Sequence, residues 1–235
     1  MVQMGESMIN TEKFRTRFQQ FKKEDRKSYP HCFSEFWKWK LQTENKSEHI
    51  LNAHNLDRTY TKLGRTLKFW QWHRPSKFSD LAPRLKNALE KIQESYDQIR
   101  EYSLLEFDRV PSEPLESIWH ELGCVKEPDQ YPNPGGYYPA MATTKPLMFL
   151  WGQTLAFDSW VRGFMPKFSL SGLTDNKWSF ETWKNVMMKF QEMLKQQPDI
   201  VELFEKLSLE EYGTDSIVPY GQFIDLYYWV RSKDY

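Results

Sequence analysis

The strongest chemical signal in this 235-residue sequence is a row of basic side chains at helical spacing. The row begins at positions i, i+4 and i+7 of one helical face and consists of Arg58, Lys62, Arg65, Lys68, Arg74 and Lys77. Asp57 is the only acidic residue between positions 56 and 77. Cations in such a row can neutralise successive phosphates of a polyanion, which makes this segment a predicted nucleic-acid contact.

Two aromatic residues extend the basic face. Phe69 and Trp72 offer flat rings on which unpaired bases could stack, as they do in single-strand binders. The alternative interpretation is purely structural: basic residues solvate an exposed helix face, and the aromatic rings complete the core. The predicted binding residues are therefore Arg58, Lys62, Arg65, Lys68, Trp72 and Arg74, with the solvated face as the competing hypothesis.

A second group of charged residues surrounds an apolar segment. Lys145 begins the segment, a turn is expected at Gly152-Gln153, and Asp158 and Arg162 follow at i, i+4. Ionisable groups beside an apolar helix are where a pocket is expected. The structural alternative is that Asp158 caps a helix and pairs with Arg162. Lys145, Asp158 and Arg162 are the candidate catalytic residues.

The order of these features resembles the helix-hairpin-helix DNA glycosylases over some twenty residues. In that family a lysine or its equivalent precedes an apolar helix, and a catalytic aspartate begins the next segment. The resemblance implies that Asp158 stabilises positive charge at a sugar and that Lys145 attacks it. Two features depart from the family: the Gly-x-Gly hairpin just before the lysine is missing, and the interval of 13 residues from Lys145 to Asp158 is short. The chain is therefore not identified as a member.

Other enzyme classes lack their signatures in this sequence. It contains no phosphate-binding loop, dinucleotide-binding loop, nucleophile elbow or kinase motif set. His120 and Cys124 lie four residues apart, but Gly123 is expected to end the helix between them, and no second ligand pair exists. We therefore expect no metal and no cofactor.

The net charge of zero conceals an asymmetric distribution. Residues 1–100 hold 20 Lys and Arg against 12 Asp and Glu, and residues 101–235 hold 12 against 20. The two halves could pack together and compensate one another, or the basic half could meet a polyanion. The leading hypothesis is a nucleic-acid-associated binding protein that uses a basic helix. The alternatives are a protein-interaction or homo-oligomer-forming subunit, and an enzyme acting on nucleic acid or nucleotide through Lys145 and Asp158.

Composition favours a soluble chain with a large aromatic core. Aromatic residues make up 16% of the sequence, including ten Trp. No N-terminal apolar segment of the signal-peptide type precedes Cys32 and Cys124, so we expect a cytoplasmic protein. The longest apolar runs are too short to span a bilayer, and no membrane partner is expected.

The elements that must position these residues are predicted to be helices. Amphipathic spacing predicts a mainly α, compact protein of about eight helices, with no confident strand. Five prolines and Gly135-Gly136 predict an ordered loop over residues 126–146, between a helical half at 1–125 and another at 147–235, packed as a single domain. The clearest predicted helices cover residues 12–25, 55–73, 82–102, 112–122 and 220–231, and another begins at Ser34. Caps are predicted at Asn10 or Thr11, Asp158, Ser179 and Asp199. A central, buried helix is predicted to start at Pro146, with Thr143 and Thr144 as its caps.

Overall fold

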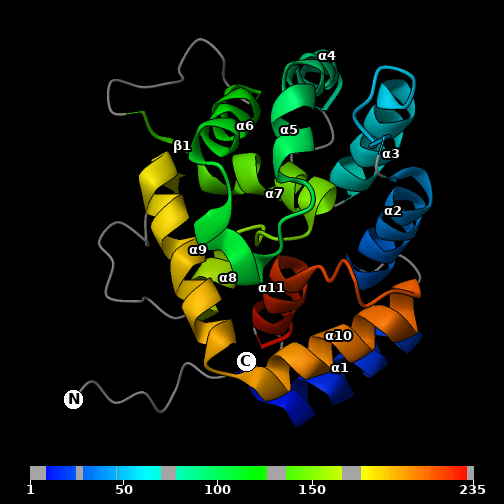
Figure 1. Cartoon of the computed structure of the whole chain (residues 1–235), viewed down its shortest axis with the longest axis vertical. Coiled ribbons are helices and arrows are strands. Elements are labelled where there is room, and N and C mark those ends of the chain that lie inside the picture. Colours follow the sequence, from blue (N-terminus) through cyan, green and yellow to red (C-terminus); the bar gives the residue numbers. More distant parts are fainter. Residues whose placement is uncertain are drawn as a thin grey trace.

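Helices form almost all of the regular structure in the computed structural model, which describes residues 9–24, 29–45, 47–69, 78–125, 136–165 and 176–231. The elements, shown in Figure 1, are α1 (Thr11–Glu24), α2 (Tyr29–Thr43), α3 (Leu56–Phe69), α4 (Phe78–Lys91), α5 (Gln93–Ile99), the 3-10 helix η2 (Leu104–Arg109), α6 (Ser112–Cys124), β1 (Tyr138–Pro139), α7 (Ala140–Trp151), α8 (Ser159–Phe164), β2 (Lys177–Trp178), α9 (Phe180–Lys195), α10 (Pro198–Tyr212) and α11 (Tyr220–Arg231). The predicted mainly α fold is confirmed, with more helices than the eight expected. The two strands pair antiparallel, Tyr138 opposite Trp178.

Helix α7 occupies the centre of the molecule (Figure 1). Every side chain from Ala142 to Trp151 is buried, and α2, α3, α6 and β1 pack around it. A helix that is apolar on all sides is stable only when neighbours cover each face, which explains this position. The sequence-based expectation of a buried helix in this segment is confirmed.

One hydrophobic core joins residues from both halves of the chain. The cluster of buried side chains extends from Ile9 to Tyr228, and α1 packs against both α10 and α11. Figure 1 shows α1 and α10 side by side along the lower edge. The basic N-terminal and acidic C-terminal parts therefore share a core.

Three predicted helix caps are present with their hydrogen bonds. Asn10 Oδ1 accepts from Lys13 N at 2.8 Å and Ser179 Oγ accepts from Thr182 N at 3.1 Å. Asp158 caps α8 by accepting from the backbone N–H groups of Trp160 and Val161. Each side chain satisfies donors that a helix N-terminus leaves without an intrahelical partner.

The start of α7 differs from the prediction. A loop was expected up to Pro146, with Thr143 and Thr144 as caps, but the helix begins at Ala140 and contains all three residues. The threonine hydroxyls donate backward, Thr143 to Pro139 O at 3.1 Å and Thr144 to Ala140 O at 2.8 Å. A threonine can cap a helix or can lie inside one and donate its hydroxyl to the preceding turn. The threonines before Pro146 were therefore compatible with either position.

Glycine 123 does not end α6 as predicted. The helix continues to Cys124, and the residue after it, Val125, keeps helical angles. A Cβ atom at Gly123 would lie 2.3 Å from Cδ1 of Tyr138, so the glycine provides space for that ring. Close packing rather than a left-handed conformation explains this residue.

Other boundaries shift for local reasons. Helix α2 begins at Tyr29, so Ser34 lies inside it and Pro30 occupies the first turn, where a missing N–H is tolerated. The predicted helix over residues 82–102 is divided into α4 and α5 at Ile92. Helix α10 begins at Pro198, with Gln197 rather than Asp199 at the cap position.

Trp72, Arg74 and residues 126–135 lie outside the described residues.

Glycine 221 permits a close approach between two backbone segments of the core, and we predict that Gly221→Ala destabilises the protein. A Cβ there would lie 2.3 Å from the carbonyl carbon of Gln153, so one of the two segments must move. The expected loss in the free energy of unfolding, measured by urea denaturation, is about 1–3 kcal/mol. The matched control is Gly163→Ala in α8, where a Cβ meets nothing within 4 Å. It should leave stability unchanged or raise it by up to roughly 1 kcal/mol through helix propensity. Equal effects of the two substitutions would contradict this packing.

Candidate functional site

Helix α3 carries the predicted basic row and is oriented by its apolar face. Leu56, Leu63 and Leu67 are buried, and the helix packs against α2, α4 and α7. Thr59, on the same buried face, donates its hydroxyl hydrogen bond to Ile50 O in the segment before the helix. The opposite face, which carries the basic residues, is therefore directed toward solvent.

The basic side chains of this face lie side by side along α3. Arg58, Arg65 and Lys68 are exposed and Lys62 is half-buried. None of the four forms an ion pair with a carboxylate of any residue that the structure describes. We call Arg58, Lys62, Arg65 and Lys68 the α3 basic face.

The one acidic residue of the segment is neutralised by its neighbour. Asp57 Oδ1 lies 2.7 Å from Lys86 Nζ of α4. The same carboxylate raises the pKa of Lys86, chiefly through this hydrogen bond. Asp57 therefore does not compensate the charges of the α3 basic face.

A tryptophan of α2 lies beneath two of these cations. Arg58 Cζ and Lys62 Nζ stand 5.7 Å and 5.4 Å from the ring centroid of Trp39, within the range of a cation–π interaction. The ring is 6% exposed. No local pattern in the sequence links Trp39 to the basic residues, because it belongs to a different helix. The predicted stacking residue Trp72 and the predicted phosphate contact Arg74 fall outside the described residues.

Of the three candidate catalytic residues, the structure brings Lys145 and Asp158 together. Lys145 of α7 is 4% exposed. The carboxylates of Asp158, at the start of α8, and Asp225, in α11, attract its ammonium group. Burial lowers the pKa of Lys145 because it disfavours the ammonium form, while the two carboxylates oppose this shift. We call Lys145, Asp158 and Asp225 the buried ionisable cluster.

Asp225 was missed by the sequence analysis, although it is the only acidic residue in the apolar last helix. Its Oδ1 accepts from Ala156 N at 2.7 Å, in the segment between α7 and α8. The next residue, Phe157, adopts a left-handed φ of 46°, which is unusual for a bulky side chain. Asp225 thus holds the strained segment that leads directly to Asp158.

Arg162 is not the partner of Asp158 that its i+4 position suggested. Its Nη2 donates to Asn176 Oδ1, just before β2. Asp158 Oδ1 instead accepts the Trp160 and Val161 N–H groups at 3.0 Å each.

A buried ion pair lies between α2, α5 and α7. Lys40 is 1% exposed and donates to Glu44, and the Tyr96 hydroxyl lies 2.8 Å from both Glu44 Oε1 and Leu150 O. Burial lowers the pKa of Lys40 despite the attraction of Glu44. Lys40 and Glu44 compensate each other in the core, and the Tyr96 hydroxyl lies between Glu44 and the Leu150 carbonyl, so we assign this group a structural role.

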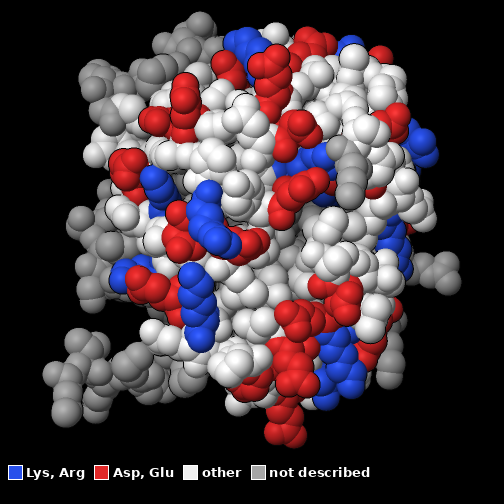
Figure 2. All heavy atoms as spheres, in the orientation of Figure 1, with Lys and Arg blue, Asp and Glu red and all other residues white. Residues whose placement is uncertain are grey.

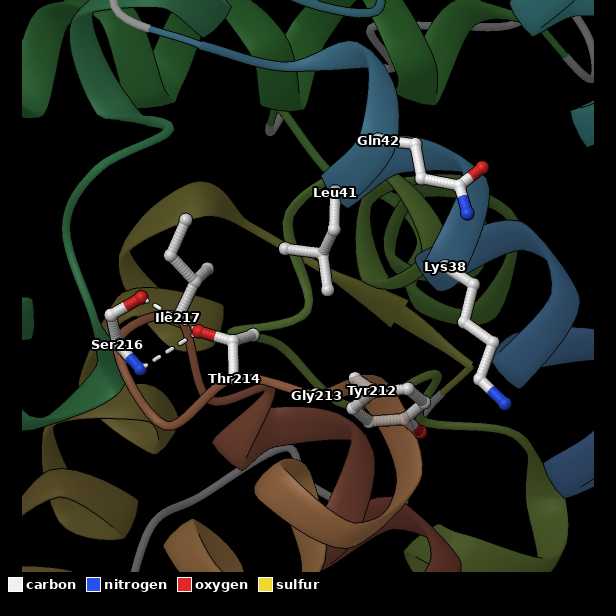
Figure 3. Close-up of a pocket in the computed structure, with 8 residues that line it drawn as sticks. All are labelled: Lys38, Leu41, Gln42, Tyr212, Gly213, Thr214, Ser216 and Ile217. Atoms are coloured by element: carbon white, nitrogen blue, oxygen red, sulfur yellow. Dashed lines mark hydrogen bonds between the residues drawn. The ribbon is translucent and has the colours of Figure 1, made fainter.

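A shallow hollow opens between the end of α2 and the segment that joins α10 to α11. Its volume is about 470 Å³, and Figure 3 shows it between Leu41 and Gln42 on one side and Thr214, Ser216 and Ile217 on the other. No candidate residue from the sequence analysis lines it.

The described residues contain neither a metal-binding group nor a membrane-spanning helix. His120 Nδ1 lies 2.6 Å from the Tyr138 hydroxyl, and no group of three His, Cys, Asp or Glu side chains in the described ranges could hold a metal ion. No helix in the part of the chain that the structure describes is long and apolar enough to cross a membrane.

Comparison of the chain with protein-family models, curated proteins and solved structures finds no match. Function must therefore be inferred from the α3 basic face and the buried ionisable cluster themselves.

The lowered pKa of Lys145 predicts a specific dependence of stability on pH. The unfolded chain, with an ordinary lysine pKa of about 10.4, binds more protons than the folded one above the lowered pKa. The free energy of unfolding should therefore rise with pH in that interval. Lys145→Met abolishes this contribution, so wild type should gain stability relative to the variant as the pH rises toward about 10.4. Urea denaturation at several alkaline pH values measures the difference, and a difference that stays constant would contradict the assignment.

Proposed function

We propose that the protein binds nucleic acid through the α3 basic face. The observation that carries this proposal is that Arg58, Arg65 and Lys68 are exposed on one helix and form no ion pair with any described carboxylate. Exposed cations without carboxylate partners are the usual means by which proteins bind a phosphate backbone.

The length of the face suits a polyphosphate rather than a single anion. Arg58 and Lys68 are ten residues apart, so their backbone positions are separated by about 15 Å along the helix axis. One strand of a duplex places a phosphate about every 3.4 Å of axis, so several phosphates fall within this length.

Acidic residues make α10 an unfavourable surface for a polyanion. The helix contains Asp199, Glu202, Glu205, Glu210 and Glu211 against a single Lys206. Figure 2 shows acidic side chains at the lower end of the visible face, where α10 lies in Figure 1, and further acidic side chains over the upper half of that face. A polyanion is repelled by the α10 carboxylates, whereas the α3 basic face offers it cations.

Salt dependence tests this proposal directly. Binding of a fluorescein-labelled DNA duplex, followed by anisotropy, should weaken steeply as salt rises. Replacing Arg58, Lys62 and Arg65 by Ala should reduce the slope of log K against log salt by roughly two to three units, because each lost phosphate contact contributes about 0.9.

The control is a triple variant with the same change in net charge on another helix. Lys184, Lys189 and Lys195 of α9 serve this purpose, since Lys189 already pairs with Glu192 and Lys195 with Asp108. Replacing these three by Ala should leave the slope nearly unchanged. Salt-independent behaviour of the wild type, or equal slopes for both triple variants, would reject the proposal and favour a protein-interaction role.

The buried ionisable cluster favours a second candidate function, covalent chemistry at a sugar. A buried lysine with a lowered pKa is more readily available as a neutral amine, the form that attacks an electrophilic carbon. Asp158 is the carboxylate that would stabilise positive charge on the sugar. Since Lys145 is 4% exposed, the segment between α7 and α8 must open to admit a substrate.

Reductive trapping tests this second function. With DNA that contains an abasic site, the Lys145 amine would add to the C1′ aldehyde and release water to form an imine, which borohydride reduces to a stable amine. The expected product is a protein–DNA adduct on a denaturing gel that Lys145→Ala abolishes. Lys184→Ala, at a half-buried lysine of α9, should still form the adduct. Absence of an adduct with wild type, or its persistence in Lys145→Ala, would exclude this chemistry.

A further inference from the structure

We infer that Trp39 is a platform that fixes Arg58 and Lys62 in position to bind phosphate groups, an inference that rests on the proposed function. Both cations lie over the same indole ring, Arg58 Cζ at 5.7 Å and Lys62 Nζ at 5.4 Å from its centroid. Indole attracts cations more strongly than the other aromatic rings do. Trp39 is therefore a positioning residue, acting through the two side chains above it.

The ring is itself held firmly by α2. It is 6% exposed and meets the Phe36 ring edge to face, with centroids 5.5 Å apart and planes at 70°. Thr43 Oγ1 donates to Trp39 O at 2.9 Å one helical turn later. The indole Nε1 is buried and has no hydrogen-bond partner among the described residues, so packing and the two cations fix the ring orientation.

Preorganisation is the physical benefit of this arrangement. Lysine and arginine side chains lose rotamer freedom when they bind a phosphate, and this loss opposes binding. Side chains already confined over a ring lose less of that freedom. Within the described part of the chain, Arg58 and Lys62 are the members of the α3 basic face that contact a ring in this way.

The platform also determines what kind of contact is made. The cations cover the Trp39 ring, so the ring is not available for base stacking. Contacts from Arg58 and Lys62 then go to phosphates, which carry no sequence information. The structure thus points to binding through this face with little dependence on base sequence.

A double-mutant cycle tests the role of Trp39. Trp39→Leu removes the ring and should weaken binding of the labelled duplex by about three- to tenfold at low salt. Trp39→Phe, which keeps a weaker ring, should show a smaller loss. In a background that already carries Arg58→Ala and Lys62→Ala, Trp39→Leu should have no further effect, because the coupled residues are gone.

A buried tryptophan far from α3 provides the matched control. Trp178 in β2 is 1% exposed and likewise has a buried Nε1 without a partner among the described residues, so Trp178→Phe should leave affinity unchanged. If Trp39→Leu weakens binding equally in both backgrounds, or in neither, the inference is overturned while the proposed function stands. If the wild type shows no salt-dependent binding, the proposed function fails and this inference fails with it.

Discussion

Complete burial of α7 is the constraint on which the rest of the structure depends. A helix without a solvent-facing side requires partners for all of its polar groups, because an unpaired polar group in the core is costly. Thr144 Oγ1 lies 2.8 Å from Ala140 O and Ala156 O, and Trp151 Nε1 donates to Tyr102 O at 3.1 Å. The Tyr96 hydroxyl lies 2.8 Å from Leu150 O. The neighbours of α7 are thereby fixed in place.

The same constraint explains why ionisable groups occur so deep in the molecule. Lys145 enters the core as part of α7, and its ammonium group is compensated by Asp158 and Asp225 from two other helices. Asp225 also supports the backbone at Ala156. Asp225 therefore stabilises the segment after α7 and compensates the charge of Lys145 as well.

The α3 basic face depends on the core in a different way. Its orientation follows from the leucines that attach α3 to α4 and α7, and Trp39 of α2 lies beneath Arg58 and Lys62. The exposed cations belong to α3 and the buried Trp39 ring belongs to α2, so this surface forms only when the two helices pack together. Helix α10 carries charge of the opposite sign, with five acidic residues against one lysine.

The sequence alone determined the helical class, most helix positions and the row of basic residues. These follow from local periodicity and capping, as at Asn10, Asp158 and Ser179, where the hydrogen bonds join residues two or three positions apart. Only the tertiary structure decided that Gly123 makes room for Tyr138 and that Asp225 joins Lys145, and likewise that Trp39 lies beneath Arg58. Such contacts join residues distant in the chain, and they arise because packing around α7 brings their helices together. No local pattern in a single sequence specifies them.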